Sequence, residues 1–159
     1  MTERETLAFL ADAGVPSVPT RLARTAEEAV AHAAEFEGEV VVKVSSEQIK
    51  HKSDVGGVKL RLAGDVAVAE AFEAIMASTG AACPDAEIEG CIVMPMRSGG
   101  VEMFVGVTCN SAWGPVIVVG LGGVWIELLS DTSLRALPIT PDDAKAMLRE
   151  LRGAKILDG

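Results

Sequence analysis

The segment from residue 40 to residue 62 constrains the fold more than any other part of the sequence. The run VVVKV at 40–44 is rich in β-branched residues and predicts a buried strand, yet it carries Lys43. An ammonium group in such a strand is costly unless it meets an anion or reaches water through its own stem. A polar loop with His51 follows, and VKLRL at 58–62 predicts a second strand. The segment therefore predicts a strand–loop–strand unit in which a nucleotide phosphate is a natural partner for Lys43.

A glycine pair closes the loop. Gly56 and Gly57 have no Cβ, so their backbone N–H groups can approach phosphate oxygens, as in glycine-rich phosphate loops. The loop matches neither GxxxxGK[ST] nor GxGxxG, so it is not one of the common nucleotide fingerprints. We expect Ser53, Gly56 and Gly57 to lie against a nucleotide phosphate.

Two interpretations of His51 are open. An imidazole is largely neutral at pH 7 and can accept a phosphoryl group, which would make His51 catalytic. The alternative is a solvated loop histidine without a chemical role. The neighbouring Lys52, Ser53 and glycine pair make the two interpretations about equally well supported. His32 has no such neighbours and is interpreted as a surface or half-buried residue of a helix.

The composition indicates a folded protein with a restricted choice of partners. The 159 residues are 49% hydrophobic and 23% charged, enough for one domain or for two small lobes that share a cleft. A net charge of −9 argues against nucleic acid or an acidic membrane as the main partner. Basic side chains nevertheless gather around the loop: Lys43, Lys50, Lys52, Lys59 and Arg61. The attraction for an anion is therefore concentrated there.

The cysteines and the start of the chain predict a cytoplasmic protein. Three cysteines without a CxxC motif suggest neither a disulfide framework nor a zinc site. The sequence MTERET lacks the features of a signal peptide, and no apolar stretch is long enough to span a bilayer.

The pattern along the chain predicts an α+β protein with two α/β lobes of mainly antiparallel sheets. Helices are expected at 4–13, 25–36, 65–80 and from 140 onward, with a short strand near 21–23. Beyond residue 86 the pattern becomes extended, and strands at 88–96, 101–108, 115–120 and 124–129 predict one antiparallel sheet. The lobes are expected near 20–80 and 86–150, with the nucleotide cleft between them.

Acidic residues of the second half are candidates for binding the rest of a nucleotide. Glu102 could accept hydrogen bonds from ribose hydroxyls, or it could be an edge-strand residue facing water. Glu127 and Asp131 could hold Mg²⁺ together with phosphate oxygens, or they could be surface or salt-bridged acids. Arg135 could pair with Asp131 or with a phosphate.

Two further segments leave alternatives open. The strand end VMPM at 93–96 could offer its backbone to an adenine edge while Met94 and Met96 pack the ring. The sequence GLGG at 120–123 could be a second phosphate loop, but a tight hairpin is favoured because it lies between two apolar strands.

Several stretches together resemble the ATP-grasp domain of NDP-forming acyl-CoA synthetases, the ADP-forming acetyl-CoA synthetase family. These are KVSS at 43–46, HKSDVGGVKL at 51–60, GVEMFVGV at 100–107, GPVIVVGLGG at 114–123 and the region 127–135. The resemblance implies the ATP-grasp fold over residues 1–159, ending earlier than the family's domain. It departs at CNSAW, residues 109–113, where the family usually has an Arg–Asp–Pro turn.

The resemblance implies an activity in which acyl-CoA, ADP and phosphate are interconverted with free acid, ATP and CoA. In this family phosphate passes from a histidine of the α part to a histidine of the β part and then to ADP. The second histidine matches His51, and Lys43 matches the strand lysine that binds nucleotide phosphates in the family. Glu102 matches the ribose-side acid, and Glu127 with Asp131 matches the Mg²⁺ region.

The implied cofactors are ATP or ADP and Mg²⁺, and the implied partner is a CoA-binding α subunit or fused domain. Without that partner we expect no ligase turnover. One alternative is a non-catalytic ATP-grasp nucleotide-binding or docking module of a larger fusion protein. Another, a carboxylate–amine ligase of the wider ATP-grasp class, does not explain the HKSDVGG motif.

Overall fold

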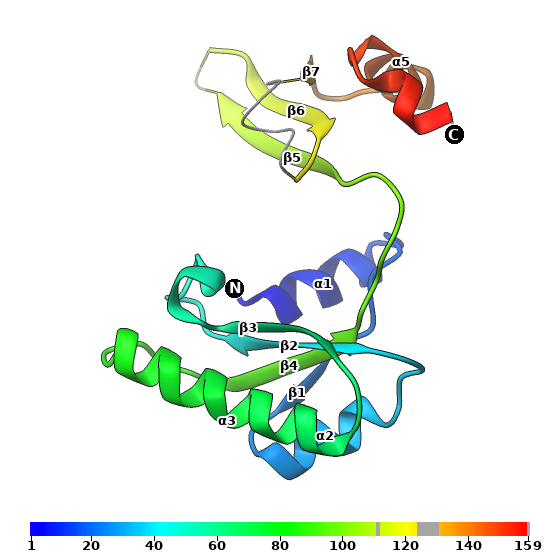
Figure 1. Cartoon of the computed structure of the whole chain (residues 1–159). Helices are drawn as coiled ribbons and strands as arrows, with labels where there is room; N and C mark the ends of the chain where they lie inside the picture. The colour runs from blue at the N-terminus through cyan, green and yellow to red at the C-terminus, as the bar shows by residue number, and fades with distance from the viewer. Residues whose placement is uncertain (111, 124–130, 159) are drawn as a thin grey trace. The chain divides into compact units, whose positions relative to one another are not determined.

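The chain folds into two compact units, Met1–Arg97 and Ser98–Gly159. The computed structural model describes residues 1–110, 112–123 and 131–158, and each unit is considered by itself (Figure 1). The expected lobes, 20–80 and 86–150, divide the chain at an earlier point. No helix in the described ranges is long and apolar enough to cross a membrane.

The first unit is a four-stranded antiparallel sheet between helices. Its elements are α1 (Glu3–Asp12), β1 (Arg21–Ala23), α2 (Ala26–Ala33), β2 (Val40–Ser45), the 3₁₀ turn η1 (Lys52–Val55), β3 (Val58–Leu62), α3 (Asp65–Ala82) and β4 (Gly90–Pro95). The strand order is β1-β4-β2-β3. Helix α1 lies over one face of the sheet, and α2 and α3 lie over the other (Figure 1).

Alternation along β2 divides the core between these two faces. Val40, Val42 and Val44 pack with residues of α2 and α3 in the larger cluster. Val41 belongs to a smaller cluster on the opposite face, to which α1 contributes Leu7. Since residues of a strand alternate between faces, Lys43 shares the face of Val41 and projects toward α1.

Local capping signals explain how the helices begin. In α1, the side chain of Thr2 accepts a hydrogen bond from the backbone N–H of Glu5, and the Glu5 carboxylate accepts one from the backbone N–H of Thr2, which makes a capping box. Helix α3 begins at the predicted residue, Asp65, with Gly64 as its N-cap. It ends later than predicted, at Ala82, because Gly80 is accommodated inside the helix.

The prediction that 88–96 joins the later strands in one sheet is wrong. Strand β4 lies between β1 and β2 in the first sheet, with Val42 opposite Val93 and Lys43 opposite Ile92. Ile92 and Val93 are completely buried because both faces of β4 are covered. The local pattern indicates a strand but does not specify the sheet in which its backbone groups find partners.

The second unit is a three-stranded antiparallel sheet with one helix. It contains β5 (Met103–Asn110), β6 (Gly114–Leu121), β7 (Thr132–Ala136), α5 (Pro141–Glu150) and the 3₁₀ turn η2 (Ala154–Asp158), with strand order β5-β6-β7. Helix α5 begins at the predicted site, where Thr140 and Asp143 form a capping box. Strand β7 was not predicted, and the strand expected at 124–129 lies outside the described residues.

Candidate nucleotide site

Lys43 has an internal anionic partner. Its Nζ lies 2.9 Å from Oε1 of Glu3, the first residue of α1. The Lys43 side chain keeps 25% of its surface exposed. The predicted strand lysine is therefore present, and in this structure a carboxylate forty positions away in sequence neutralises it.

Lys52 meets the same carboxylate. Its Nζ lies 3.0 Å from Oε2 of Glu3, and its side chain is 19% exposed. Burial opposes ionisation of Glu3, but the hydrogen bonds and charges of Lys43 and Lys52 outweigh it and lower the pKa of the carboxyl. Glu3, Lys43 and Lys52 thus form a three-residue ion cluster, which is called the lysine clamp below.

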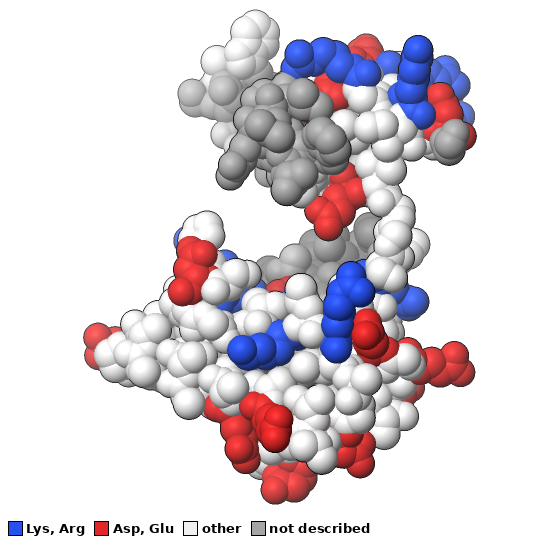
Figure 2. Space-filling view, viewed as in Figure 1, with Lys and Arg blue, Asp and Glu red and all other residues white. Residues whose placement is uncertain are grey.

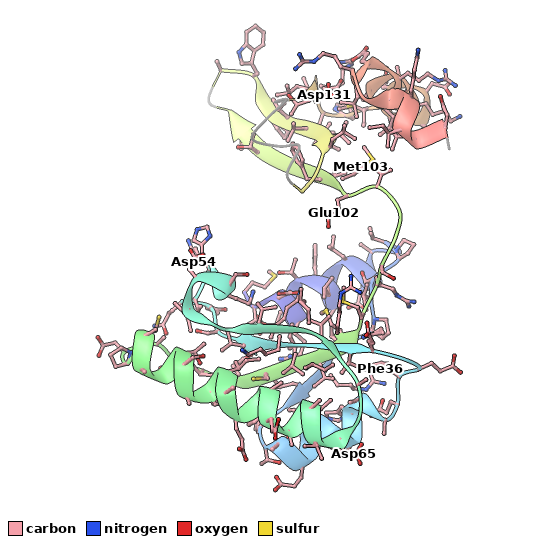
Figure 3. The ribbon with its side chains drawn as sticks, viewed as in Figure 1. Phe36, Asp54, Asp65, Glu102, Met103 and Asp131 are labelled. Carbon is pink, nitrogen blue, oxygen red and sulfur yellow. The ribbon has the colours of Figure 1, made fainter. Side chains whose placement is uncertain are left out.

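His51 lies directly beside this clamp in the chain. It is exposed and occupies the position before η1, and its side chain makes no capping hydrogen bond. Ser53 and Asp54 are also exposed on the same turn, where Asp54 is labelled in Figure 3. An imidazole placed in this way is accessible to a reacting group, and the neighbouring residue Lys52 is held by Glu3.

The glycine pair shapes the turn from within. The N–H of Gly56 donates to the carbonyl of Ser53, and that of Gly57 donates to the carbonyl of Lys52. Gly56 has a φ of +68°, which favours glycine, and a Cβ on Gly57 would lie 2.7 Å from Cγ1 of Val44. In this structure both N–H groups therefore bond within the turn, and their contact with a nucleotide phosphate remains a prediction.

Met94 and Met96 lie on the α1 face of the first sheet. Met94 is buried in the smaller cluster with Val41 and Ile92, and Met96 is half-buried at its margin. The backbone N–H of Met96 donates to the carbonyl of Glu39. Packing against an adenine ring therefore remains a prediction, and it suits Met96 better than the covered side chain of Met94.

Glu102 belongs to the second unit and is exposed just before β5 (Figure 3). Its carbonyl accepts a hydrogen bond of 2.6 Å from the N–H of Gly122. A Cβ on Gly123 would overlap the Glu102 carboxylate, so the side chain lies against a segment without side chains. The carboxylate is accessible, as a ribose contact requires.

Arg135 has a partner that the sequence did not suggest. Its guanidinium pairs with Glu150 at the end of α5, and its Nη1 also donates to the carbonyl of Leu134. Arg135 therefore links β7 to α5, and Asp131 is not its partner in this structure.

The carboxylate of Asp131 accepts hydrogen bonds from the backbone. Its Oδ1 and Oδ2 accept hydrogen bonds of 2.8 Å each from the N–H groups of Arg152 and Gly153. These two bonds lower the pKa of the Asp131 carboxyl, against the effect of burial. Glu127 lies outside the described residues, and within those residues no group of three or more His, Cys, Asp or Glu could hold a metal. The role of Asp131 in binding Mg²⁺ remains a prediction.

The second unit also contains a concavity of about 360 Å³ that is remote in sequence from the predicted site residues. It lies between α5 and η2, over which several Lys and Arg side chains gather in Figure 2. The lining residues are Lys145, Leu148, Arg149, Ala154, Lys155, Leu157 and Asp158. None of the predicted site residues that the structure describes lines this concavity, whereas the lysine clamp and His51 have the side chains that phosphate chemistry needs.

Sequence reasoning missed Glu3. An acidic residue in the first turn of a helix is a common stabilising feature, so its presence after Thr2 indicated nothing more. The contact with Lys43 and Lys52 depends on α1 lying across the sheet, which no local pattern reveals.

Comparison of the chain with known proteins identifies its family. Residues 1–159 match the ATP-grasp domain family. The β subunit of the ADP-forming acetate–CoA ligase I of Pyrococcus furiosus is 40% identical over 159 residues, which are all of this chain and 68% of that subunit. The ADP-forming 4-hydroxybutyrate–CoA ligase of Nitrosopumilus maritimus is 36% identical over the whole chain, which spans 23% of its length.

A solved structure agrees closely with this fold. The dinucleotide forming acetyl-coenzyme A synthetase 1 of Ca. Korarchaeum cryptofilum, in complex with coenzyme A, Ca-AMPCP and HgCl⁺, has a TM-score of 0.95 and 39% identity. The match covers 100% of this chain and 69% of that one. The chain therefore belongs to the ATP-grasp domain family.

Within that family the chain corresponds to the β part of the ADP-forming acyl-CoA ligases, the part that contains the ATP-grasp module. The α+β fold class and the family resemblance inferred from the sequence are both confirmed.

Proposed function

We propose that this chain is the nucleotide-binding, phosphoryl-relay component of an ADP-forming acyl-CoA ligase, with His51 as the residue that carries the phosphoryl group. The observation that carries the proposal is that His51 is exposed and directly precedes Lys52 of the lysine clamp in the chain. The complete reaction, acyl-CoA with ADP and phosphate giving acid, ATP and CoA, requires a CoA-binding α subunit or fused domain. A cytoplasmic location accords with the three free cysteines.

The proposed nucleotide contacts are given for each unit by itself. In the first unit Lys43 and Ser53 bind phosphate oxygens, Gly56 and Gly57 shape the loop, and Met94 and Met96 pack near the base. In the second unit Glu102 accepts hydrogen bonds from the ribose hydroxyls, and Arg135 supplies positive charge for a phosphate. Mg²⁺ is proposed to accompany the nucleotide, as it does in a relative's complex with Mg-AMPPCP, and no step is assigned to it.

The reaction proposed for His51 is the transfer of the γ-phosphoryl group of ATP to its imidazole. A ring nitrogen of neutral His51 attacks the γ-phosphorus of ATP, a nitrogen–phosphorus bond forms, and the bond to the bridging oxygen breaks. ADP leaves, and the proton of the imidazole passes to solvent. Lys43 and Lys52 contribute by positioning the phosphates and stabilising their charge. These two effects account for most of the catalysis of phosphoryl transfer.

A related structure supports the relay. The synthetase of Ca. Korarchaeum cryptofilum is also described with coenzyme A and Mg-AMPPCP, its phosphohistidine segment pointing towards the nucleotide binding site. That chain is 35% identical and has a TM-score of 0.82. A phosphohistidine segment that points towards the nucleotide site is consistent with phosphoryl transfer at that site, for which we propose His51 as an acceptor.

The test is transfer of phosphate from γ-³²P-ATP with Mg²⁺ to the purified chain. We expect an alkali-stable, acid-labile label that is lost in His51→Asn and kept in His32→Asn. His32 is a matched control because it is half-buried in α2, where its Nδ1 lies 3.1 Å from Glu35. If ATP binds but never labels His51, the chain is a nucleotide-binding or docking module instead.

Nucleotide binding itself is tested by calorimetric titration with ADP and Mg²⁺. Lys43→Ala should weaken binding by about tenfold or more, because a charge-assisted phosphate contact is lost. Lys59→Ala removes an exposed lysine from β3 and should leave the affinity within about twofold. Equal loss in both variants would show that only the overall charge of the surface matters.

A further inference from the structure

Glu3 joins two lysines that come from different elements. Lys43 is on the central strand β2, and Lys52 opens the η1 turn directly after His51. Each Nζ is within 3.0 Å of a different oxygen of the one carboxylate. The link therefore holds the strand and the histidine loop in a fixed relation through α1.

The clamp retains the capacity to bind an anion. Two ammonium groups and one carboxylate leave one net positive charge. Each ammonium has three N–H donors, and Glu3 accepts from one donor of each lysine, so further donors are available to a phosphate. Both side chains also keep part of their surface in solvent, at 25% and 19%.

Holding the lysines in advance favours binding. A free lysine loses much rotamer freedom when it is immobilised on a ligand, whereas a lysine already held by a counter-ion loses less. Without Glu3, two partly buried ammonium groups would repel each other and move apart. Protein kinases use the same principle, since a helix glutamate holds the strand lysine that contacts the phosphates.

We infer that Glu3 is a positioning residue, which holds Lys43 and Lys52 together as one phosphate-binding unit and orients the His51 loop. The inference rests on the proposed nucleotide-binding function and adds α1 to its machinery. The opposite role, a carboxylate that occupies the phosphate position and is displaced by the ligand, makes the opposite prediction.

The test uses inorganic tripolyphosphate, a probe that needs the lysines but neither a base nor a ribose contact. We expect calorimetry to show binding to the wild type that is about tenfold weaker in Glu3→Gln. Glu5→Gln is the matched control. It removes the same charge from the same turn of α1, where Glu5 contacts only Thr2 among the hydrogen bonds of the capping box. Its affinity should stay within about twofold of the wild type.

Two further readouts separate positioning from helix stability. Trace acetylation followed by mass spectrometry should show Lys43 and Lys52 reacting faster in Glu3→Gln but not in Glu5→Gln. Glu3→Asp keeps the charge but is one methylene too short to span both lysines, so its affinity should fall between those of the wild type and Glu3→Gln.

The outcomes are distinct. Unchanged or tighter tripolyphosphate binding in Glu3→Gln, full affinity in Glu3→Asp, or no binding by the wild type would each overturn the inference. If only the proposed function fails, the results differ: tripolyphosphate binding still depends on Glu3, but γ-³²P-ATP never labels His51.

Discussion

Asp131 and Gly153 are joined by a hydrogen bond of 2.8 Å, in which the backbone N–H of Gly153 donates to Oδ2 of the buried carboxylate. The N–H of Arg152 donates to the other oxygen at the same distance. Asp131, which is labelled in Figure 3, lies just before β7, and residues 152 and 153 follow α5. The carboxylate therefore anchors the turn after α5 to the sheet of the second unit.

Replacing Asp131 by Asn should destabilise the second unit without any metal present. An amide has only one acceptor oxygen, so its NH₂ would face a backbone N–H and leave that donor unsatisfied. We expect thermal denaturation in EDTA, followed by circular dichroism, to show a midpoint lowered by several degrees. Asp142→Asn is the control because that side chain is 93% exposed and lies 3.4 Å from Lys145. A normal midpoint in Asp131→Asn, with Mg²⁺-dependent nucleotide binding lost, would restore the metal role.

The same carboxylate predicts how stability depends on pH. The N–H groups of Gly153 and Arg152 hold the pKa of Asp131 below its ordinary value of ~3.9, so the unfolded chain binds more protons than the folded one. The contribution is fully present above pH ~4 and is lost as the pH falls through the lower pKa of the folded state. Urea unfolding at neutral pH and near pH 3 should show a smaller loss on acidification in Asp131→Asn than in the wild type. An equal loss in both proteins would contradict this.

Adding a methyl group at Gly57 should disturb the His51 loop. A Cβ there would lie 2.7 Å from Cγ1 of Val44 and 2.9 Å from the carbonyl oxygen of Lys52, which cannot move without the turn. We expect Gly57→Ala to cost about 1–3 kcal/mol in free energy of unfolding and to weaken tripolyphosphate binding. Gly80→Ala is the contrasting variant. A Cβ at Gly80 in α3 would meet open space, so alanine there should raise the free energy of unfolding by about 0.5–1 kcal/mol. Equal effects at both positions would argue against the crowding at Gly57.

The three cysteines should differ widely in their reaction with a thiol reagent. Cys91 is completely buried in β4, and burial raises the pKa of its thiol to about 12. Cys109 is exposed and Cys83 is intermediate. Alkylation of the native protein, read by mass spectrometry, should therefore modify Cys109 first and Cys91 only when the first unit unfolds. Rapid native labelling of Cys91 would mean that β4 opens readily.

Several features could be predicted from short stretches of sequence because they depend on neighbouring residues. The caps at Thr2 and Thr140 are local hydrogen bonds between residues three apart. The strand lysine and the exposed loop histidine also follow from local patterns, and the family could be inferred from several such motifs. None of these inferences requires knowledge of which segments meet in the fold.

The sequence by itself determined where most helices and strands form, the family, and which side chains can do phosphate chemistry. The tertiary structure decided that β4 joins the first sheet and that Glu3 meets Lys43 and Lys52. It also decided that Asp131 and Arg135 serve the packing of α5 in the second unit. The physical reason is that a buried charge or strand edge is satisfied by whatever group the fold brings near, and such partners are remote in sequence.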